Sequence, residues 1–436
     1  TQSQGLSKER IPVVHNTVRS SLVDSTTFWN SGRFTALIIK NMQWYLVNLH
    51  ILAVLIFIPP AVAFILQFHL SNSLVTNLPL AIVSPELTDG QATCSTFQRT
   101  ECDGSGRPFT CRLLDLLTDS SLDIALYDNL KEAKMAARKN KVWGVLHFNE
   151  LYTDALAERM NFDLFSTNDT VVNASFIDVY MDMSNMLISS ALMTELYEDV
   201  RSMIQEMLQD CGYNPKIFDI PIQKMPPIYG SNNPSLLEFA IPGVLCAISF
   251  CMAVIYGITS VMFERTIGLE RSFVAGLSKL ELMTSHFSFQ MVIAVLQQLL
   301  MLLVFYCVYN NPHRGNMYLA FLLLLLVHML GSFFAQAAAI AHATERAAMT
   351  TGFGSVQILF LIGGVLWPAE GMHGILRNIT WAIPVQPAVE AYRAIVMRDW
   401  KISHPVVYKG FLSTSAWTVI FLVMTIALAR KKNFTL

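Results

Sequence analysis

Acidic and basic side chains alternate with apolar ones in the stretch Phe263–Lys279, which reads FERTIGLERSFVAGLSK and which we call the elbow. Carboxylate and guanidinium groups at this density form ion pairs and charge-assisted hydrogen bonds, the chemistry of docking rather than of catalysis. We predict a short amphipathic helix whose apolar side chains meet a partner or lipid while its charged side chains face outward. The alternative is a solvated turn that touches only lipid headgroups. The residues expected to act here are Glu264, Arg265, Gly268, Glu270, Arg271 and Gly276.

The sequence offers no catalytic constellation. His147 stands alone in a predicted strand, and the neighbouring carboxylates are scattered as solvated charge. No metal site is expected, because the cysteines lack a C-x-x-C spacing and an accompanying histidine. The phosphate loop G-x-x-x-x-G-K-[ST] does not occur, so we do not expect this chain to bind ATP in the usual way.

The composition is that of an integral membrane protein. Hydrophobic residues make up 53% of the chain and charged residues only 14%, whereas about a quarter of a soluble domain is charged. The mean hydropathy is +0.43. A net charge of -2 argues against nucleic acid as a partner, because no surplus of Lys and Arg is available for phosphates.

Six segments are apolar and long enough to cross a hydrocarbon core of about 30 Å, which takes roughly 20 helical residues. The predicted fold class is therefore an α-helical membrane protein. Residues 1–45 form a cytoplasmic linker and an amphipathic connecting helix, residues 69–238 an outer domain, and residues 239–436 the remaining spans. The six predicted spans are Leu46–Phe68, Phe239–Met262, Met283–Tyr309, Met317–Ala341, Met349–Leu366 and Phe411–Leu428.

The basic residues of the short loops predict the orientation, since Lys and Arg favour the cytoplasmic side. They flank the spans on the side of the elbow and of both termini, which we therefore place in the cytoplasm of a multi-pass plasma-membrane protein. Residues 69–238 are then extracellular. Three Asn-x-Ser/Thr sequons fall on this outer side, at Asn168, Asn173 and Asn378, and we expect glycans there.

The outer domain is predicted to be a compact α/β lobe. Residues 78–83, 141–148 and 176–183 have the composition of strands, and a helix around Ser121–Lys139 leads into the second of them. After Asp182, apolar residues recur on one helical face, which predicts a long amphipathic helix ending at Gly212.

Four cysteines lie in this outer domain, an oxidising compartment where two disulfides are expected. Three connectivities are possible, and we favour pairings that close the Gly- and Ser-rich stretch Thr88–Thr110. The alternative is that some of these thiols stay free. The four cysteines are Cys94, Cys102, Cys111 and Cys211.

Two further segments lie along or within the membrane boundary. Residues 32–48 place Phe34, Leu37 and Tyr45 on one helical face, with Arg33 and Lys40 elsewhere, which predicts a helix on the cytoplasmic surface. Residues 367–410 contain several Gly and Pro residues, so we expect a broken, re-entrant extracellular segment rather than one helix.

The elbow and the segment GGVLWPAEGMHGILRNITWAIPVQPAVEAYRAIVMRDW resemble two motifs of the ABC-2 type membrane domain of ABC exporters. In that family, the elbow corresponds to a coupling helix that docks into the ATP-binding domain. The large outer domain follows the first span here, which is most similar to the arthropod-type subfamily H half transporters, related to subfamily G. The resemblance implies that ATP and Mg²⁺ bind on a nucleotide-binding domain, either upstream on the same polypeptide or on a separate subunit.

The resemblance also implies a substrate path at the axis of a homodimer. Its wall would carry Ser249, Met252 and Tyr256 from the second span and Gln357 and Phe360 from the fifth. An apolar extracellular gate would be formed by Val365 and Leu366, where the family usually has Leu at both positions. Polar residues within the spans, such as Gln297 and Gln298, serve either helix contacts or substrate.

The resemblance favours the transmembrane half of an ATP-driven exporter. A cavity without clustered charge suits lipids or other amphipathic molecules, moved by alternating access. One alternative is a receptor or scaffold whose outer lobe binds a ligand. Another is an ABC-2 exporter of polymers such as polysaccharide.

Overall fold

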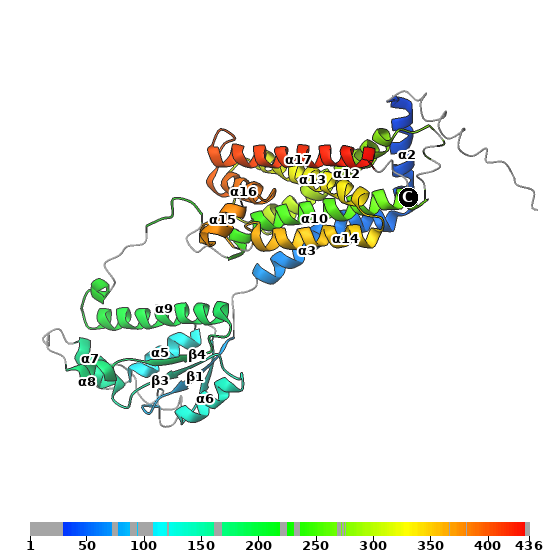
Figure 1. Ribbon diagram of the computed structural model, residues 1–436. Helices are drawn as coiled ribbons and strands as arrows, with labels where there is room; N and C mark the ends of the chain where they lie inside the picture. Colours follow the sequence, from blue (N-terminus) through cyan, green and yellow to red (C-terminus); the bar gives the residue numbers. More distant parts are fainter. Residues whose placement is uncertain are drawn as a thin grey trace, which may run out of the picture. The chain divides into compact units, whose positions relative to one another are not determined.

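The computed structural model separates two compact units, residues 1–70 with 226–436 and residues 71–225 (Figure 1). The first is helical and the second is α/β. The residues that the structure describes are 29–71, 77–87, 94, 108–119, 122–160, 168–218, 225–230, 236–267, 272, 274, 276–365, 367–380 and 382–431.

The α/β unit contains a four-stranded sheet in the order β2-β1-β3-β4, with β4 antiparallel to the rest. Its core lies on both faces because side chains alternate along a strand. Leu80 and Ile82 of β1 face the helices α5, α7 and α9, whereas Ala81 and Val83 face α6. The strands are β1 Pro79–Val83, β2 Asp123–Leu126, β3 Gly144–His147 and β4 Asp178–Met181.

Three helices of this unit, α6, α8 and α9, begin at asparagines whose side chains cap them. Asn129 caps the backbone of α6, and α9 stops at Cys211 and Gly212, whose φ of +76° suits glycine. The predicted amphipathic helix is thus confirmed. The helices are α5 Phe109–Asp119, α6 Leu130–Arg138, α7 Tyr152–Met160, α8 Asp169–Ala174, α9 Met186–Asp210 and the 3₁₀ turn η1 Pro215–Phe218.

One local prediction was wrong. The helix expected around Ser121–Lys139 is a strand, β2, followed by the shorter α6. The strand pairs in parallel with β1 from Asp123 to Leu126.

A disulfide between Cys94 and Cys111 closes most of the Thr88–Thr110 stretch, with the two Cα atoms 5.4 Å apart. This confirms the favoured kind of pairing. Cys211 is also disulfide-bonded, and Cys102 lies outside the described residues.

The helical unit is a bundle of long helices, with α2 lying crosswise at the end where α10 finishes (Figure 1). Five helices of the described chain are long and apolar enough to cross a membrane. They are α3 Leu49–Ser71, α10 Leu236–Ile267, α12 Lys279–Leu302 with its π-helical continuation η2 Leu303–Val308, α13 Met317–Ala341 and α17 Pro405–Lys431. The remaining helices are α2 Ser31–Val47, α14 Glu345–Ile362, the 3₁₀ turn η3 Ala369–Gly371, α15 Gly374–Thr380 and α16 Gln386–Arg398.

The predicted fifth span, Met349–Leu366, corresponds to α14, which does not meet that criterion. Its 18 residues begin with Glu345 and Arg346 and include Thr, Gly and Gln, so their mean apolarity is lower. The structure therefore supports about five membrane helices rather than the six predicted.

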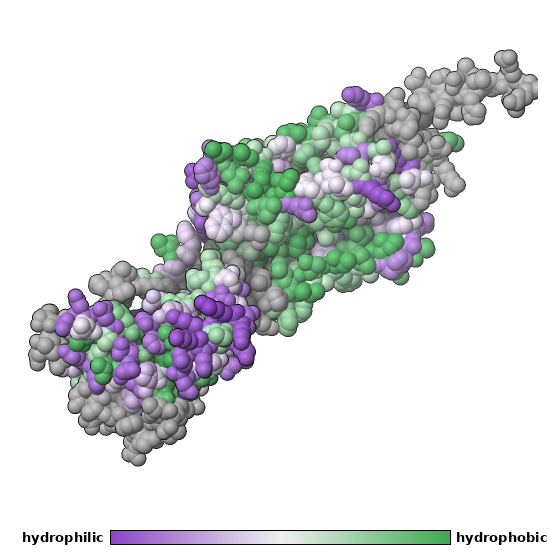
Figure 2. Space-filling model, turned by 60° about the horizontal axis from the view of Figure 1, so that its bottom comes forward, coloured by the Kyte–Doolittle hydropathy of each residue, from purple (hydrophilic) through white to green (hydrophobic). Residues whose placement is uncertain are grey.

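Close contacts between small residues hold α10 against α13. A Cβ added to Gly257 would lie 2.6 Å from the Cβ of Ala335, and one added to Gly331 would lie 2.8 Å from that of Ala253. Close approach through Gly and Ala is typical of helices that pack within membranes. Apolar residues cover much of the visible surface of this unit (Figure 2), as a lipid environment requires.

Candidate functional site

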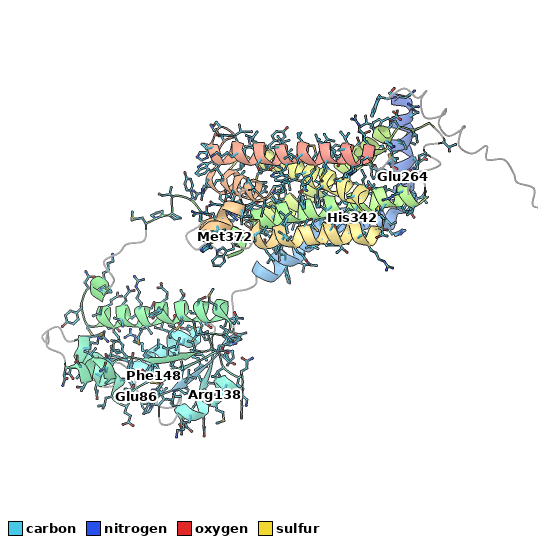
Figure 3. All side chains as sticks on the ribbon, in the orientation of Figure 1. Glu86, Arg138, Phe148, Glu264, His342 and Met372 are labelled. Carbon is cyan, nitrogen blue, oxygen red and sulfur yellow. A yellow bond between two sulfur atoms is a disulfide. The ribbon has the colours of Figure 1, made fainter. Side chains whose placement is uncertain are left out.

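The elbow lies where α10 ends and α12 begins, at one end of the helical bundle. Figure 3 shows Glu264 and His342 at this end of the unit and Met372 at the opposite end. Gly268, Glu270 and Arg271 lie outside the described residues. The geometry that follows therefore rests on the two flanks of the elbow.

Glu264 on the α10 flank is buried, with 5% of its surface exposed. Its carboxylate accepts hydrogen bonds from Lys40 Nζ at 2.7 and 2.8 Å and from Ser272 Oγ at 2.9 Å. Burial of a carboxylate is tolerated when it is paired and hydrogen-bonded, and both conditions hold here. Glu264 thus links α10, the elbow and α2.

Glu281 on the α12 flank is completely buried and has a parallel arrangement. Its Oε2 accepts from the backbone N of Ser278 at 2.8 Å, while Ser278 Oγ accepts from the backbone N of Glu281, forming a capping box at the start of α12. Its Oε1 accepts from the backbone N of Asn30 at 2.6 Å and lies 3.3 Å from Arg33 Nη2. The first turn of α12 is therefore tied to α2.

Arg33 also binds a residue of the elbow directly. Its Nη1 donates to the carbonyl of Gly276 at 2.8 Å, and Gly276 has a φ of +81°, a conformation that favours glycine. The guanidinium thus joins the last turn of the elbow to the buried carboxylate of Glu281.

One face of α2 makes all these contacts. Arg33, Leu37 and Lys40 recur at the helical spacing of four and three residues, and Leu37 packs against Leu282 and Leu277. The prediction that the basic residues lie away from the Leu37 face was wrong, because the opposing elements offer carboxylates on either side of an apolar contact. We call Arg33, Leu37 and Lys40 the α2 clasp.

Arg265 points to a different partner, the end of α13. Its Nη1 donates to the carbonyl of His342 at 2.7 Å and to that of Ala339 at 3.3 Å. A guanidinium at this position satisfies terminal carbonyls and complements the helix dipole. The expectation that Glu264 and Arg265 face outward was therefore wrong, since both bind elements of the same chain.

The residues expected along a substrate path lie in two different environments. Ser249 and Tyr256 of α10 are buried inside the bundle, and Met252 is half-buried. Gln357 and Phe360 lie on the exposed side of α14. Their role as a cavity wall remains a prediction.

Hydrogen bonds explain why Ser249 is buried. Its hydroxyl donates to the carbonyl of Leu324 at 3.1 Å and accepts from Gln298 Nε2 at 2.7 Å, which joins α10, α12 and α13. Gln297 similarly donates to the carbonyl of Leu55 in α3 at 2.7 Å. These glutamines make contacts between helices, one of the two roles left open by the sequence.

The predicted gate is described only at Val365, because Leu366 lies outside the described residues. Val365 is fully buried, and its Cα lies 2.6 Å from the position that a Cβ on Gly243 would occupy. Glycine at 243 therefore lets the chain after α14 pack directly on α10.

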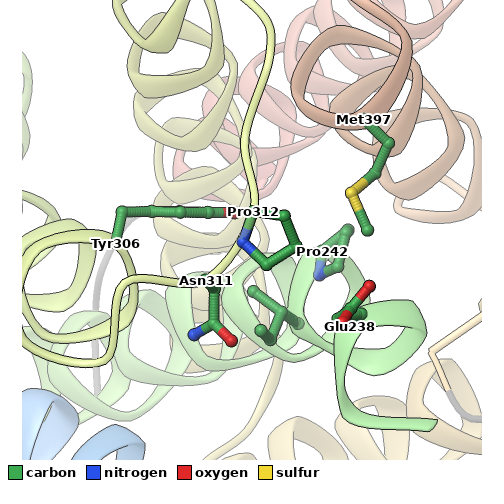
Figure 4. Close-up of a pocket in the computed structure, with 7 residues that line it drawn as sticks. Glu238, Pro242, Tyr306, Asn311, Pro312 and Met397 are labelled. Carbon is green, nitrogen blue, oxygen red and sulfur yellow. The ribbon is translucent and has the colours of Figure 1, made fainter. Parts of the chain in front are cut away.

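A small cavity of about 10 Å³ lies near this end of α10 (Figure 4). This volume holds at most one water molecule, so it is too small for a transported substrate. Its lining residues are Glu238, Ile241, Pro242, Tyr306, Asn311, Pro312 and Met397.

The three sequons have exposed asparagines. Asn168 caps the N-terminus of α8, Asn173 lies within α8, and Asn378 lies in α15. Their exposure is compatible with glycan attachment, which remains a prediction.

Sequence reasoning missed the clasp as a functional feature. The signals were present, since Ser278 and Glu281 have the S-x-x-E spacing of a capping box and Arg33 and Lys40 are two helical turns apart. The sequence did not reveal that the carboxylates that pair with these basic residues lie more than 200 residues further along the chain.

Comparison with known proteins identifies the family of this helical unit. The model of the ABC-2 family transporter proteins matches residues 49–430. The match covers most of the chain, which belongs to that family.

Two curated relatives come from Dictyostelium discoideum. The chain is 26% identical to ABC transporter G family member 20 over 318 residues, which are 71% of this chain and 41% of the relative. It is 22% identical to ABC transporter G family member 23 over 279 residues, which are 62% of this chain and 37% of that relative. The chain thus spans about two fifths of the length of the curated relatives it matches.

Proposed function

We propose that this chain is the transmembrane half of an ATP-driven exporter that moves lipids or other amphipathic molecules across the plasma membrane. It works as a homodimer by alternating access, with ATP and Mg²⁺ bound on a nucleotide-binding domain that is upstream on the same polypeptide or on a separate subunit. Membership of the ABC-2 transporter family supports the class of protein. The position of the α/β unit after the first membrane helix supports a subfamily H type of half transporter, with this unit outside the cell.

The single observation that carries the mechanism is the pairing of both flanks of the elbow with α2. Glu264 and Glu281 are each buried and each bound by a base of the α2 clasp. Both described flanks of the elbow are therefore fixed to neighbouring elements, so a push on the elbow would act on those elements directly. It is passed to α10, α12 and α2 together, which makes the elbow a suitable receiver for closure of the nucleotide-binding domain.

The interaction of Lys40 with Glu264 contributes to the stability of the elbow flank. Breaking a buried pair by removing one partner costs about 3–5 kcal/mol. Lys40 is half exposed, with 48% of its side chain accessible, so solvent screening reduces this to about 1–3 kcal/mol here. That is enough to loosen the elbow without unfolding the bundle.

The test is transport by the full-length protein in liposomes, with its nucleotide-binding domain present. We expect Glu264→Ala to retain ATP hydrolysis but to lose most of the coupling of hydrolysis to lipid movement, read as lipid transferred per ATP hydrolysed. The exchanged pair Lys40→Glu with Glu264→Lys should recover part of that ratio. Glu345→Ala is the matched control, because Glu345 is an exposed carboxylate at the start of α14 and makes no described ion pair. Transport by Glu264→Ala at the wild-type rate per ATP would refute the coupling role.

A further inference from the structure

The guanidinium of Arg393, in the re-entrant segment, binds two other parts of the bundle at once. It lies on α16. Most side chains of this helix are buried, and those of Ala388, Val389 and Tyr392 are fully buried. Its Nη2 donates to the carbonyl of Gly364 at 3.2 Å and to that of Phe239 at 3.4 Å. The guanidinium also lies 4.1 Å from the centre of the Phe239 ring, within the range of a cation–π contact.

The partners of Arg393 are not those expected from its sequence neighbours. Glu390, one turn away, is hydrogen-bonded to Gln386, and no described carboxylate lies within ion-pair distance of Arg393. The carboxylates of Glu370 and Glu390 are still close enough to stabilise the positive charge electrostatically. Arg393 therefore uses its directional donors on main-chain carbonyls rather than on an acid.

Both carbonyls border the Val365–Gly243 contact, which includes one residue of the predicted gate. Gly364 directly precedes Val365, which is fully buried against Gly243, and Phe239 lies one helical turn before Gly243 in α10. Gly364 has a φ of +76°, so the chain turns sharply there and presents its carbonyl to α16. One side chain of α16 thus holds the end of α14 and the start of α10 on either side of the Val365–Gly243 contact.

We propose that Arg393 is a latch that keeps this gate closed in the resting transporter. Opening separates Val365 from Gly243, which requires the Gly364 and Phe239 carbonyls to leave the guanidinium. The latch is a positioning residue, acting through main-chain carbonyls rather than by touching substrate. The inference rests on the proposed function, because only a transporter needs a gate. The Arg393 contacts can nevertheless be tested without measuring transport or ATP hydrolysis.

The experiment measures how often position 365 becomes accessible in the purified full-length protein. Val365→Cys is placed in a background lacking Cys251 and Cys307, and its rate of reaction with a bulky, charged maleimide is followed without nucleotide. For each variant, a parallel sample without Val365→Cys gives the background rate of the remaining thiols, including the buried Cys246, and this rate is subtracted. We expect Arg393→Gln to raise the labelling rate of the Val365→Cys protein at least tenfold, because both charge-assisted bonds are lost.

Two further variants make the result specific. Arg393→Lys keeps the charge but loses the planar guanidinium whose Nη2 donates to both carbonyls and whose face lies on the Phe239 ring, so we expect an intermediate rise of about threefold. Arg398→Gln, on the same helix and packed on Trp400 instead, should leave the rate unchanged. If Arg393→Gln does not reach the membrane, Arg393→Lys carries the test by itself.

Wild-type labelling rates in Arg393→Gln, or in Arg393→Lys where only that variant folds, would overturn the latch. An equal rise in Arg398→Gln would also overturn it, because the effect would then be a general loosening of α16. Loss of transport coupling in Glu264→Ala is measured separately, so the proposed function and the latch can fail independently.

Discussion

Exchanging glycine and alanine at the crossing of α10 and α13, with Gly257→Ala and Ala335→Gly, tests whether the stability of the bundle depends on the close approach of these helices. A Cβ on Gly257 would lie 2.6 Å from the Cβ of Ala335, whereas carbon atoms in contact are about 3.5–4.0 Å apart. Gly257→Ala therefore forces the helices apart by about 1 Å. Ala335→Gly removes the methyl group that Gly257→Ala would strike.

The expected magnitudes follow from opposing effects. Overpacking costs about 1–3 kcal/mol, and replacing a helical glycine by alanine returns about 0.5–1 kcal/mol, so Gly257→Ala should lose roughly 0.5–2 kcal/mol. Ala335→Gly should lose about 1 kcal/mol through helix propensity. The double variant carries one methyl group at the crossing, as the natural pair does, so its stability should return close to that of the natural protein.

The assay is the free energy of unfolding in mixed detergent micelles, from a reversible SDS titration followed by circular dichroism. The double-mutant cycle should give a favourable coupling of about 1.5–3 kcal/mol, the sum of the two single losses. Gly354→Ala in α14 is the control, because a Cβ there meets nothing within 4 Å and should only stabilise. Additive losses, with no recovery in the double variant, would refute the argument that steric contact at this crossing sets the helix separation.

Two further predictions concern the α/β unit. Cys111→Ser should lower the stability of this unit by about 3 kcal/mol, because the Cys94–Cys111 bond closes a loop of sequence separation 17. Reductant should lower the thermal stability by at least as much, because it also breaks the disulfide of Cys211. Burial, together with the nearby Glu86 carboxylate, raises the pKa of the Tyr152 phenol above its ordinary value of 10.0. The unfolded chain then releases this proton before the folded one, so stability should fall as the pH rises above about 10, by up to about 1.4 kcal/mol per pH unit. Tyr152→Phe should remove that slope, and an unchanged slope would contradict the assignment.

The parts of the fold that the sequence predicted are those set by local patterns. Residues 78–83 formed β1 because a strand buried on both faces is a continuous apolar run. The edge strand β2 was missed because it lies only three residues before the capped helix α6 and was included in the helix predicted there. Short edge strands depend on pairing with a neighbour, here β1, rather than on their own composition.

At the candidate site, the sequence identified the charged residues but not their directions. Glu264 and Arg265 are adjacent in α10, yet one binds Lys40 of α2 and the other binds the end of α13. Those partners lie at sequence separations of 224 and 77 residues. Charge patterning predicts that such residues interact, but only the tertiary arrangement decides whether they face solvent, a partner protein or a neighbouring helix.

The proposed elbow and the Val365–Gly243 contact beside the proposed latch involve opposite ends of α10. α10 has 32 residues, which is about 48 Å of helix, with Glu264 near one end and Gly243 near the other. Between them, Ser249 and Gly257 fasten α10 to α13 by a hydrogen bond and a close contact. A displacement received at Glu264 would therefore move α10 and α13 together rather than bend α10 alone. The exception is Pro242, which removes a backbone hydrogen bond beside Gly243, so the helix is most easily deformed at the point where Val365 rests on it.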